Sequence, residues 1–358
     1  MAYSGSKAAS VYGYSSTRVK AMESKLLGSD ILGRLAGLED VPSMVGLLLQ
    51  TDYKQYIEEF GGMDMKAELA DFALSKSLEC DVQKLIYVVP KEQKEMTMHI
   101  VGRSDAQNIK LVFYAKAEQK DYDYISRYVV ESYNIDAGTV KRAIEELTVE
   151  DAAALLAVRT PYGIVVNSAL NAYRNTHNLT EVNAAIDKGF FRLLEGAIRK
   201  LSGISRESAS IIRMDMEMRN ILTILRAKRY GMSIDKVNDL LIERGITSIE
   251  DMLDMFESSS SIGELAMKVS SFDLKDAVSA YESNKWHRML QFEIAMRNAI
   301  FKKAVALLRH SSLSYGVIIG YFYLKEIEVF TLRILINGRS LGLSNEEINR
   351  MIAWKLGA

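Results

Sequence analysis

The sequence has little of several residues that mark common protein classes. Among 358 residues there is one cysteine, Cys80, so no disulfide can form within the chain, which is typical of a reducing compartment. There are only three prolines, and because proline interrupts helix interiors, their scarcity allows long helices. No alternating apolar and polar stretch is long enough to predict a strand with certainty. These absences favour an all-α protein.

Charge of one sign and long apolar runs are missing as well. The formal net charge is −1, so the chain has no basic surplus that would attract nucleic acid, and we expect no nucleic-acid partner. The most apolar run, Tyr315 to Leu324, has ten residues. A membrane-spanning helix needs about 20, so this run predicts a buried helix and the chain is expected to have no membrane span.

The residues that are present predict a helical globular protein. Apolar residues make up 48% and charged residues 25%, enough to bury a sizeable core. Helix boundaries can be placed from capping residues. Thr148 followed by two acids predicts a helix start, and Ser344 with Glu347 predicts a capping box. The serine-rich stretch 257–264 predicts a loop.

Self-comparison finds three similar segments, "DAQNIKLVFYAKAEQ", "EMRNILTILRAKRYG" and "EVFTLRILINGRSLG". Their carboxylates are 112 and 111 residues apart. The segments share a carboxylate, a polar residue three positions later and a basic residue: Asp105, Asn108 and Lys116; Glu217, Asn220 and Lys228; Glu328, Thr331 and Arg339. The spacing predicts three tandem, homologous helical domains, which we place at 9–128, 129–244 and 245–358.

Within each segment, the carboxylate and the basic residue are eleven positions apart. Eleven helical steps of about 100° bring both to one face, about 16 Å apart along the axis, so they cannot pair with each other. Each therefore needs a partner on another helix, at a helix N-terminus or in solvent. We interpret the motif as a structural contact that fixes helix packing. The sharper alternative, three carboxylates gathered in a catalytic or metal cluster, is disfavoured because equivalent residues of tandem repeats lie in separate domains.

The signatures of common catalytic sites are absent from the sequence. It contains no GxxxxGK[ST] phosphate loop, no GxSxG and no HExxH. The four histidines, His99, His177, His287 and His310, lack metal-ligand spacing. We therefore expect no enzyme activity, no metal and no cofactor.

Both ends of the chain resemble a known family. "YGYSSTRVKAMESKLL" (12–27) is similar to the opening of the C subunit of archaeal and bacterial A/V-type rotary ATPases, whose eukaryotic relative is the d subunit. "YLKEIEVFTLRILINGRSLGLSNEEINRMI" (323–352) resembles that family's C-terminal signature, and "DAQNIKLVFYAK" and "EMRNILTILRAK" resemble its internal copies. The resemblance covers nearly the whole chain. Thr331 departs from the asparagine that is more frequent in the family, which puts the polar contact of the third copy in doubt.

The resemblance implies a function as well as a fold. It implies three helical domains around a pseudo-threefold axis, forming a funnel between the central stalk and the membrane ring of proteolipid subunits. The chain would be a non-catalytic socket that transmits torque for ATP-coupled ion transport. Its partners would be the D and F subunits of the shaft and the proteolipid ring, and it would sit peripherally at the cytoplasmic face of the membrane.

Two other functions stay open from the residues alone. One is a helical-repeat scaffold that binds a peptide or protein partner, although a period of about 112 residues exceeds the 20–50 of solenoid repeats. The other is a helical enzyme with unrecognised chemistry, which would need a deep pocket with clustered acids.

Overall fold

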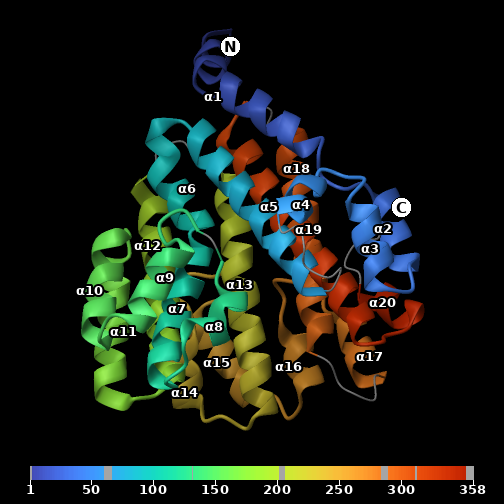
Figure 1. Ribbon diagram of the computed structural model, residues 1–358. Coiled ribbons are helices and arrows are strands. Elements are labelled where there is room, and N and C mark those ends of the chain that lie inside the picture. The colour runs from blue at the N-terminus through green and yellow to red at the C-terminus, as the bar shows by residue number, and fades with distance from the viewer. Residues whose placement is uncertain are drawn as a thin grey trace.

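The computed structural model describes residues 2–59, 67–130, 132–200, 206–283, 289–310 and 313–351 (Figure 1). In this part of the chain there are α-helices and two short 3-10 helices, and no strand. The predicted all-α fold class is therefore confirmed for the described residues.

The helices follow one another with short connections. The first third of the chain contains α1 (Ala2–Glu23), α2 (Ser29–Gly37), α3 (Val41–Leu48), α4 (Lys54–Glu59), α5 (Ala67–Val88), η1 (Lys91–Gln93), α6 (Lys94–Val101) and α7 (Arg103–Ala117). The middle third contains α8 (Tyr122–Ile125), η2 (Ser126–Tyr128), α9 (Ala137–Glu145), α10 (Val149–Arg159), α11 (Gly163–Thr176), α12 (Leu179–Lys200) and α13 (Arg206–Arg229). The last third contains α14 (Ile234–Leu240), α15 (Ile249–Glu257), α16 (Ile262–Lys268), α17 (Lys275–Ser283), α18 (Leu290–His310), α19 (Tyr315–Ser340) and α20 (Asn345–Met351).

Several helices begin where their capping residues predict. The Thr148 side chain accepts a hydrogen bond from the Asp151 N–H at the start of α10. Before α20, the Ser344 hydroxyl accepts from the Glu347 N–H, and the Glu347 carboxylate accepts from the Ser344 N–H. These reciprocal bonds form the predicted capping box. The predicted loop at 257–264 is shorter, because α15 continues to Glu257 and α16 begins at Ile262.

The apolar run at Tyr315–Leu324 forms the start of α19, and all ten of its residues are buried. This helix packs against α18, α5 and α1. The run is apolar on every side because neighbours surround this part of the helix, as expected inside a large domain. The sequence prediction of a buried helix at this run is confirmed.

The two ends of the chain share a core. A separate hydrophobic cluster joins residues of α2–α5, such as Leu35 and Met44, to residues of α19, such as Leu332 and Leu335, and to Ile348 of α20. Figure 1 shows the blue helices α2 and α3 beside the red helix α20. Residues about 300 positions apart in the sequence therefore form one packed unit.

Packing also joins helices across the predicted domain boundaries. Helix α7 packs against α12, α13 against α18, and α19 against α5. Each of α5, α12 and α18 is thus paired with a helix that carries one copy of the sequence motif. The domain limits 9–128, 129–244 and 245–358 stay a prediction.

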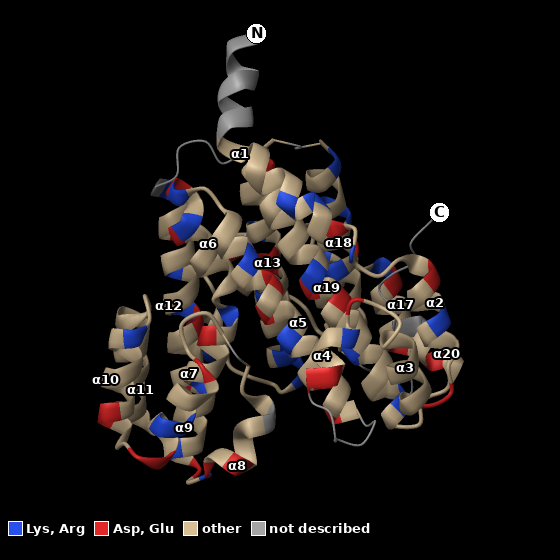
Figure 2. Cartoon of the chain, turned by 45° about the horizontal axis from the view of Figure 1, so that its top comes forward, with Lys and Arg blue, Asp and Glu red and all other residues tan. Residues whose placement is uncertain are grey.

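Charged residues of both signs lie side by side on the helices, as Figure 2 shows. Many of them form exposed pairs one helical turn apart, such as Lys54 with Glu58 and Lys141 with Glu145. Such exposed pairs contribute about 0.3–0.5 kcal/mol each. The position of the helices is therefore determined by the buried core and by the buried polar contacts described next.

Candidate functional site

The three motif carboxylates are fully buried, and each accepts hydrogen bonds from a different segment. Asp105 on α7 accepts from the Asn134 N–H and from the Ser132 hydroxyl. Glu217 on α13 accepts from the N–H groups of Ile246 and Thr247. These donors lie one to four residues before the N-cap residue of a short helix, Asp136 for α9 and Ser248 for α15.

Glu328 on α19 follows the same pattern across the whole chain. Its carboxylate accepts from the N–H of Leu27, the residue before the N-cap Gly28 of α2. The three carboxylates therefore lie at the entrances of three different helices and do not form a cluster with one another.

The motif bases contact the other ends of the same short helices. Lys116 donates to the carbonyl of Ile144 in α9, Lys228 donates to the carbonyl of Phe256 in α15, and Arg339 donates to the carbonyl of Ala36 in α2. Each carbonyl lies eight residues after the N-cap residue of its helix. Unpaired carbonyls at a helix C-terminus carry partial negative charge, which a lysine or arginine stabilises.

This geometry explains the eleven-residue spacing of the motif. Helices α2, α9 and α15 each have nine residues, or about 13 Å, close to the roughly 16 Å between the carboxylate and the base. The carboxylate contacts the positive end of the helix macrodipole and the base contacts the negative end. We call each arrangement a clamp: Asp105 and Lys116 on α9, Glu217 and Lys228 on α15, and Glu328 and Arg339 on α2.

The amide of the motif adds two hydrogen bonds in the first two clamps. Asn108 donates to the carbonyl of Val130 and accepts from its N–H, and Asn220 does the same with Ile242. Both pairs are 22 residues apart. Thr331 cannot form this contact, and its hydroxyl donates to Ile327 within its own helix.

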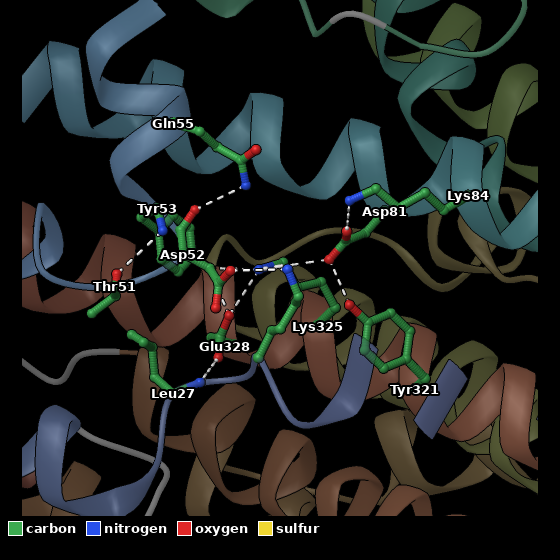
Figure 3. A network of polar contacts seen from close by, with 11 residues as sticks. Leu27, Thr51, Asp52, Tyr53, Gln55, Asp81, Lys84, Tyr321, Lys325 and Glu328 are labelled. Carbon is green, nitrogen blue, oxygen red and sulfur yellow. Dashed lines mark hydrogen bonds and ion pairs between the residues drawn. The ribbon is translucent and has the colours of Figure 1, made fainter. Parts of the chain in front are cut away.

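Around Glu328, other polar groups take the place of the missing amide (Figure 3). The Lys325 ammonium lies 2.9 Å from Glu328 Oε1 and donates to the hydroxyl of Tyr53 at 2.9 Å, and that hydroxyl donates to the same Oε1 at 2.7 Å. Asp81 extends the network and accepts from Tyr321. Burial and the Glu328 charge raise the pKa of Tyr53.

A second set of equivalent residues does converge, and the sequence prediction missed it. Arg103, Asp215 and Glu326 each lie two positions before a motif carboxylate, so their spacing repeats the 112 and 111 residues of the motif. Arg103 binds Asp215 at 2.7 Å and Glu326 at 2.7 Å, and it donates to the Tyr323 hydroxyl at 3.0 Å. We call this group the hub. The regular spacing of the three hub residues was visible in the sequence. A comparison by residue type does not align one basic residue with two acidic ones, so the hub was not predicted.

Comparison with known proteins agrees with the sequence resemblance. The sequence profile of the ATP synthase (C/AC39) subunit family matches residues 15–351. The chain belongs to the ATP synthase (C/AC39) subunit family. It is 27% identical to the C subunit of the A-type ATP synthase of Methanocaldococcus jannaschii, over 95% of this chain and 86% of the relative. It is 24% identical to the corresponding C subunit of Methanosarcina barkeri, over 94% and 91%. With the C subunit of Thermococcus onnurineus the identity is 26%, over 95% and 90%.

In this C/AC39 family member, the motif carboxylates and bases contact groups of its own chain. Among the described residues, no group of three or more His, Cys, Asp or Glu side chains could hold a metal ion. In the same part of the chain, no helix is both long and apolar enough to cross a membrane. The clamps and the hub hold helices in place.

Electrostatics differ between the hub and the first clamp. Burial alone would raise the pKa of Asp215, but the charges of Arg103, Arg219 and Arg297 outweigh it and lower the pKa. In contrast, burial raises the pKa of Asp105 above its ordinary value, because no cation compensates and its Ser132 and Asn134 hydrogen bonds only partly offset the burial. The contributions of the two aspartates to folding stability therefore change with pH in opposite directions.

The second clamp predicts a stability effect. Glu217→Ala leaves the N–H groups of Ile246 and Thr247 without their acceptor, so the variant should lose about 1–3 kcal/mol of unfolding free energy. Urea denaturation of the variant and of Glu250→Ala, an exposed acid in the first turn of α15, makes the comparison. Equal midpoints for Glu217→Ala and the wild type would show that the clamp contributes nothing.

The hub predicts that charge can be relocated between equivalent positions. Arg103→Glu places three acids together in a buried site and should destabilise by about 3–5 kcal/mol, the range for breaking a buried ion pair. The double variant Arg103→Glu/Glu326→Arg restores one cation and should recover more than half of this loss. Arg174→Glu, at an exposed pair, is the control. If the double variant is no more stable than Arg103→Glu, the hub does not act as an ion pair.

The two aspartates predict opposite pH effects on stability. Because the folded-state pKa of Asp215 is lowered, its contribution is present above the unfolded value of about 3.9 and is lost as pH falls through the folded value. The raised pKa of Asp105 means that stability is lost as pH rises from the unfolded value through the folded one. Unfolding free energies of wild type, Asp215→Asn and Asp105→Asn from about pH 3 upward test this. For each variant, the difference in unfolding free energy from wild type is plotted against pH. If the two plots slope in the same direction, the prediction is contradicted.

Proposed function

We propose that this chain is a non-catalytic socket of an A-type rotary ATPase, joining the rotating shaft to the proteolipid ring. The observation that carries the proposal is the hub, in which Arg103 binds Asp215 and Glu326 from two other helices. A part that transmits torque must resist rotation of its units against one another, and a buried ion pair network between units opposes that rotation. The relatives, which are C subunits of A-type ATP synthases, support this assignment.

Three similar units around a pseudo-threefold axis are part of the proposal. It is supported by the repeated clamps, by the nine-residue helices that they hold, and by the hub residues at equal spacing. We propose that the ranges 9–128, 129–244 and 245–358 are three repeats of the sequence. As packed units, the third would combine α19 with α2–α5, because the third clamp joins Glu328 to Leu27. The family resemblance implies a funnel, with the shaft entering one end, and we include this shape in the proposal.

The proposed partners are the D and F subunits of the shaft and the proteolipid ring. The location would be the cytoplasmic face of the membrane, through binding to the ring, since a chain with a formal charge of −1 has no general attraction to an anionic bilayer. The polar groups of the clamps and hub serve internal contacts, so the chain is expected to hydrolyse no nucleotide.

The test of this function uses membranes that contain the motor. Removing the chain should leave ATP hydrolysis in the catalytic head possible while ion pumping stops, because a shaft without a socket cannot turn the ring. Adding back wild type should restore pumping, and adding back Arg103→Glu should restore less. Full-rate coupled pumping in membranes without the chain would refute the socket.

A further inference from the structure

A cavity of about 300 Å³ lies between α12 and the segment that precedes α15. Its basic lining residues are Lys188, Arg192 and Arg199 from α12 and Arg244 from the segment, and its acidic ones are Glu195 and Glu243. Four bases face two acids, although the whole chain is close to neutral. Arg192 pairs with Glu243 at 3.7 Å and Arg199 with Glu195 at 3.2 Å, so the excess positive charge of the lining comes from Lys188 and Arg244.

The wall of this cavity contains a buried carboxylate oxygen without a donor. Glu195 is 6% exposed, and its Oε1 accepts from Arg199 Nε at 3.2 Å. Its Oε2 has no hydrogen-bond partner among the described residues. A buried carboxylate oxygen that lacks a donor is unfavourable, so a donor from a bound molecule would stabilise the site.

The segment on the other side of the cavity is held in an unusual conformation. Arg244 has a φ of 69°, in the left-handed region that arginine rarely adopts. Two residues earlier, Ile242 is fixed by both of its bonds to Asn220. Gly245, the residue after Arg244, leaves room for Glu217, whose Oε2 would lie 2.5 Å from an added Cβ. The clamp therefore fixes the backbone that carries Arg244 at the cavity.

A corresponding contact elsewhere in the molecule is almost closed. There, α5 meets the segment before α9, and the cavity is only about 20 Å³. Ser132 lies four residues before the N-cap Asp136, as Arg244 lies four residues before Ser248, and Glu79 lines the contact from α5. The fold does not require an open, basic cavity at this type of contact, so the opening beside α12 needs its own explanation.

We propose that the cavity beside α12 binds an acidic polypeptide segment of a partner protein. Carboxylates of that segment would pair with Lys188, Arg192 and Arg244, and one of its backbone N–H groups would donate to Glu195 Oε2. A peptide supplies both kinds of group along one chain, which matches the mixed chemistry of the wall. Under the proposed function, on which this identification rests, the partner is a protein of the shaft.

The experiment measures binding of the full-length chain to the purified shaft proteins of the same motor, at about 0.05 M and about 0.5 M KCl, where charge screening differs. Lys188→Glu/Arg192→Glu reverses two charges at the cavity. Lys141→Glu/Arg142→Glu reverses two exposed charges on α9 and is the matched control. Deca-glutamate and inorganic phosphate serve as competitors, and urea midpoints check that each variant folds.

We expect the cavity double variant to raise the Kd on the order of 10-fold at low salt and to reduce the salt dependence, while the α9 control stays within about 2-fold. Deca-glutamate should compete, and phosphate should not. If wild type binds the shaft and both double variants bind alike, the cavity proposal fails and the socket stands.

The remaining outcomes separate the two proposals. If wild type takes up deca-glutamate through the cavity but does not bind the shaft, the acidic-peptide site is supported and the socket fails. Competition by phosphate as strong as that by deca-glutamate would overturn the peptide in favour of a small-anion site.

Discussion

Burial of one guanidinium between helices from three parts of the chain constrains the whole structure. Arg103 is held between Asp215 and Glu326 and lies over the rings of Phe322 and Tyr323. A buried charge must keep its partners, because removing any of them leaves an uncompensated ion in a medium of low polarity. Helices α7, α13 and α19 therefore meet at a fixed point, and their angles determine where the three clamps lie.

Each of α7, α13 and α19 extends from the hub and contacts a shorter helix, α9, α15 or α2, at both of its ends. A nine-residue helix is too short to be stable alone in water, since isolated helices below about 12–15 residues are marginal. The clamp supplies an anion at one end and a cation at the other, so the short helix is stabilised by its dipole as well as by its apolar face. The same arrangement occurs three times and positions the three short helices.

The sequence predicted the clamps in part. The eleven-residue spacing placed Glu217 and Lys228 on one face and excluded a bond between them, which required partners elsewhere. Those partners are backbone groups, such as the N–H of Ile246 and the carbonyl of Phe256, and backbone groups leave no mark in a sequence. The departure at Thr331 was visible, but the replacement network of Lys325, Tyr53 and Glu328 joins residues more than 270 positions apart. The hub was not predicted from the sequence, because comparison by residue type does not match an arginine with two acids.

The shared core of the chain ends sets an order of events during synthesis. Helices α2–α4 leave the ribosome early, but Leu332 and Leu335 of α19, against which they pack, are made about 300 residues later. At about 5–20 residues per second, the residues that α19 contributes to this core arrive roughly 15–60 s after the early helices. Until then Leu35 and Met44 can pack only against other residues of α2–α5, such as Leu74, so this part of the core is completed when α19 arrives.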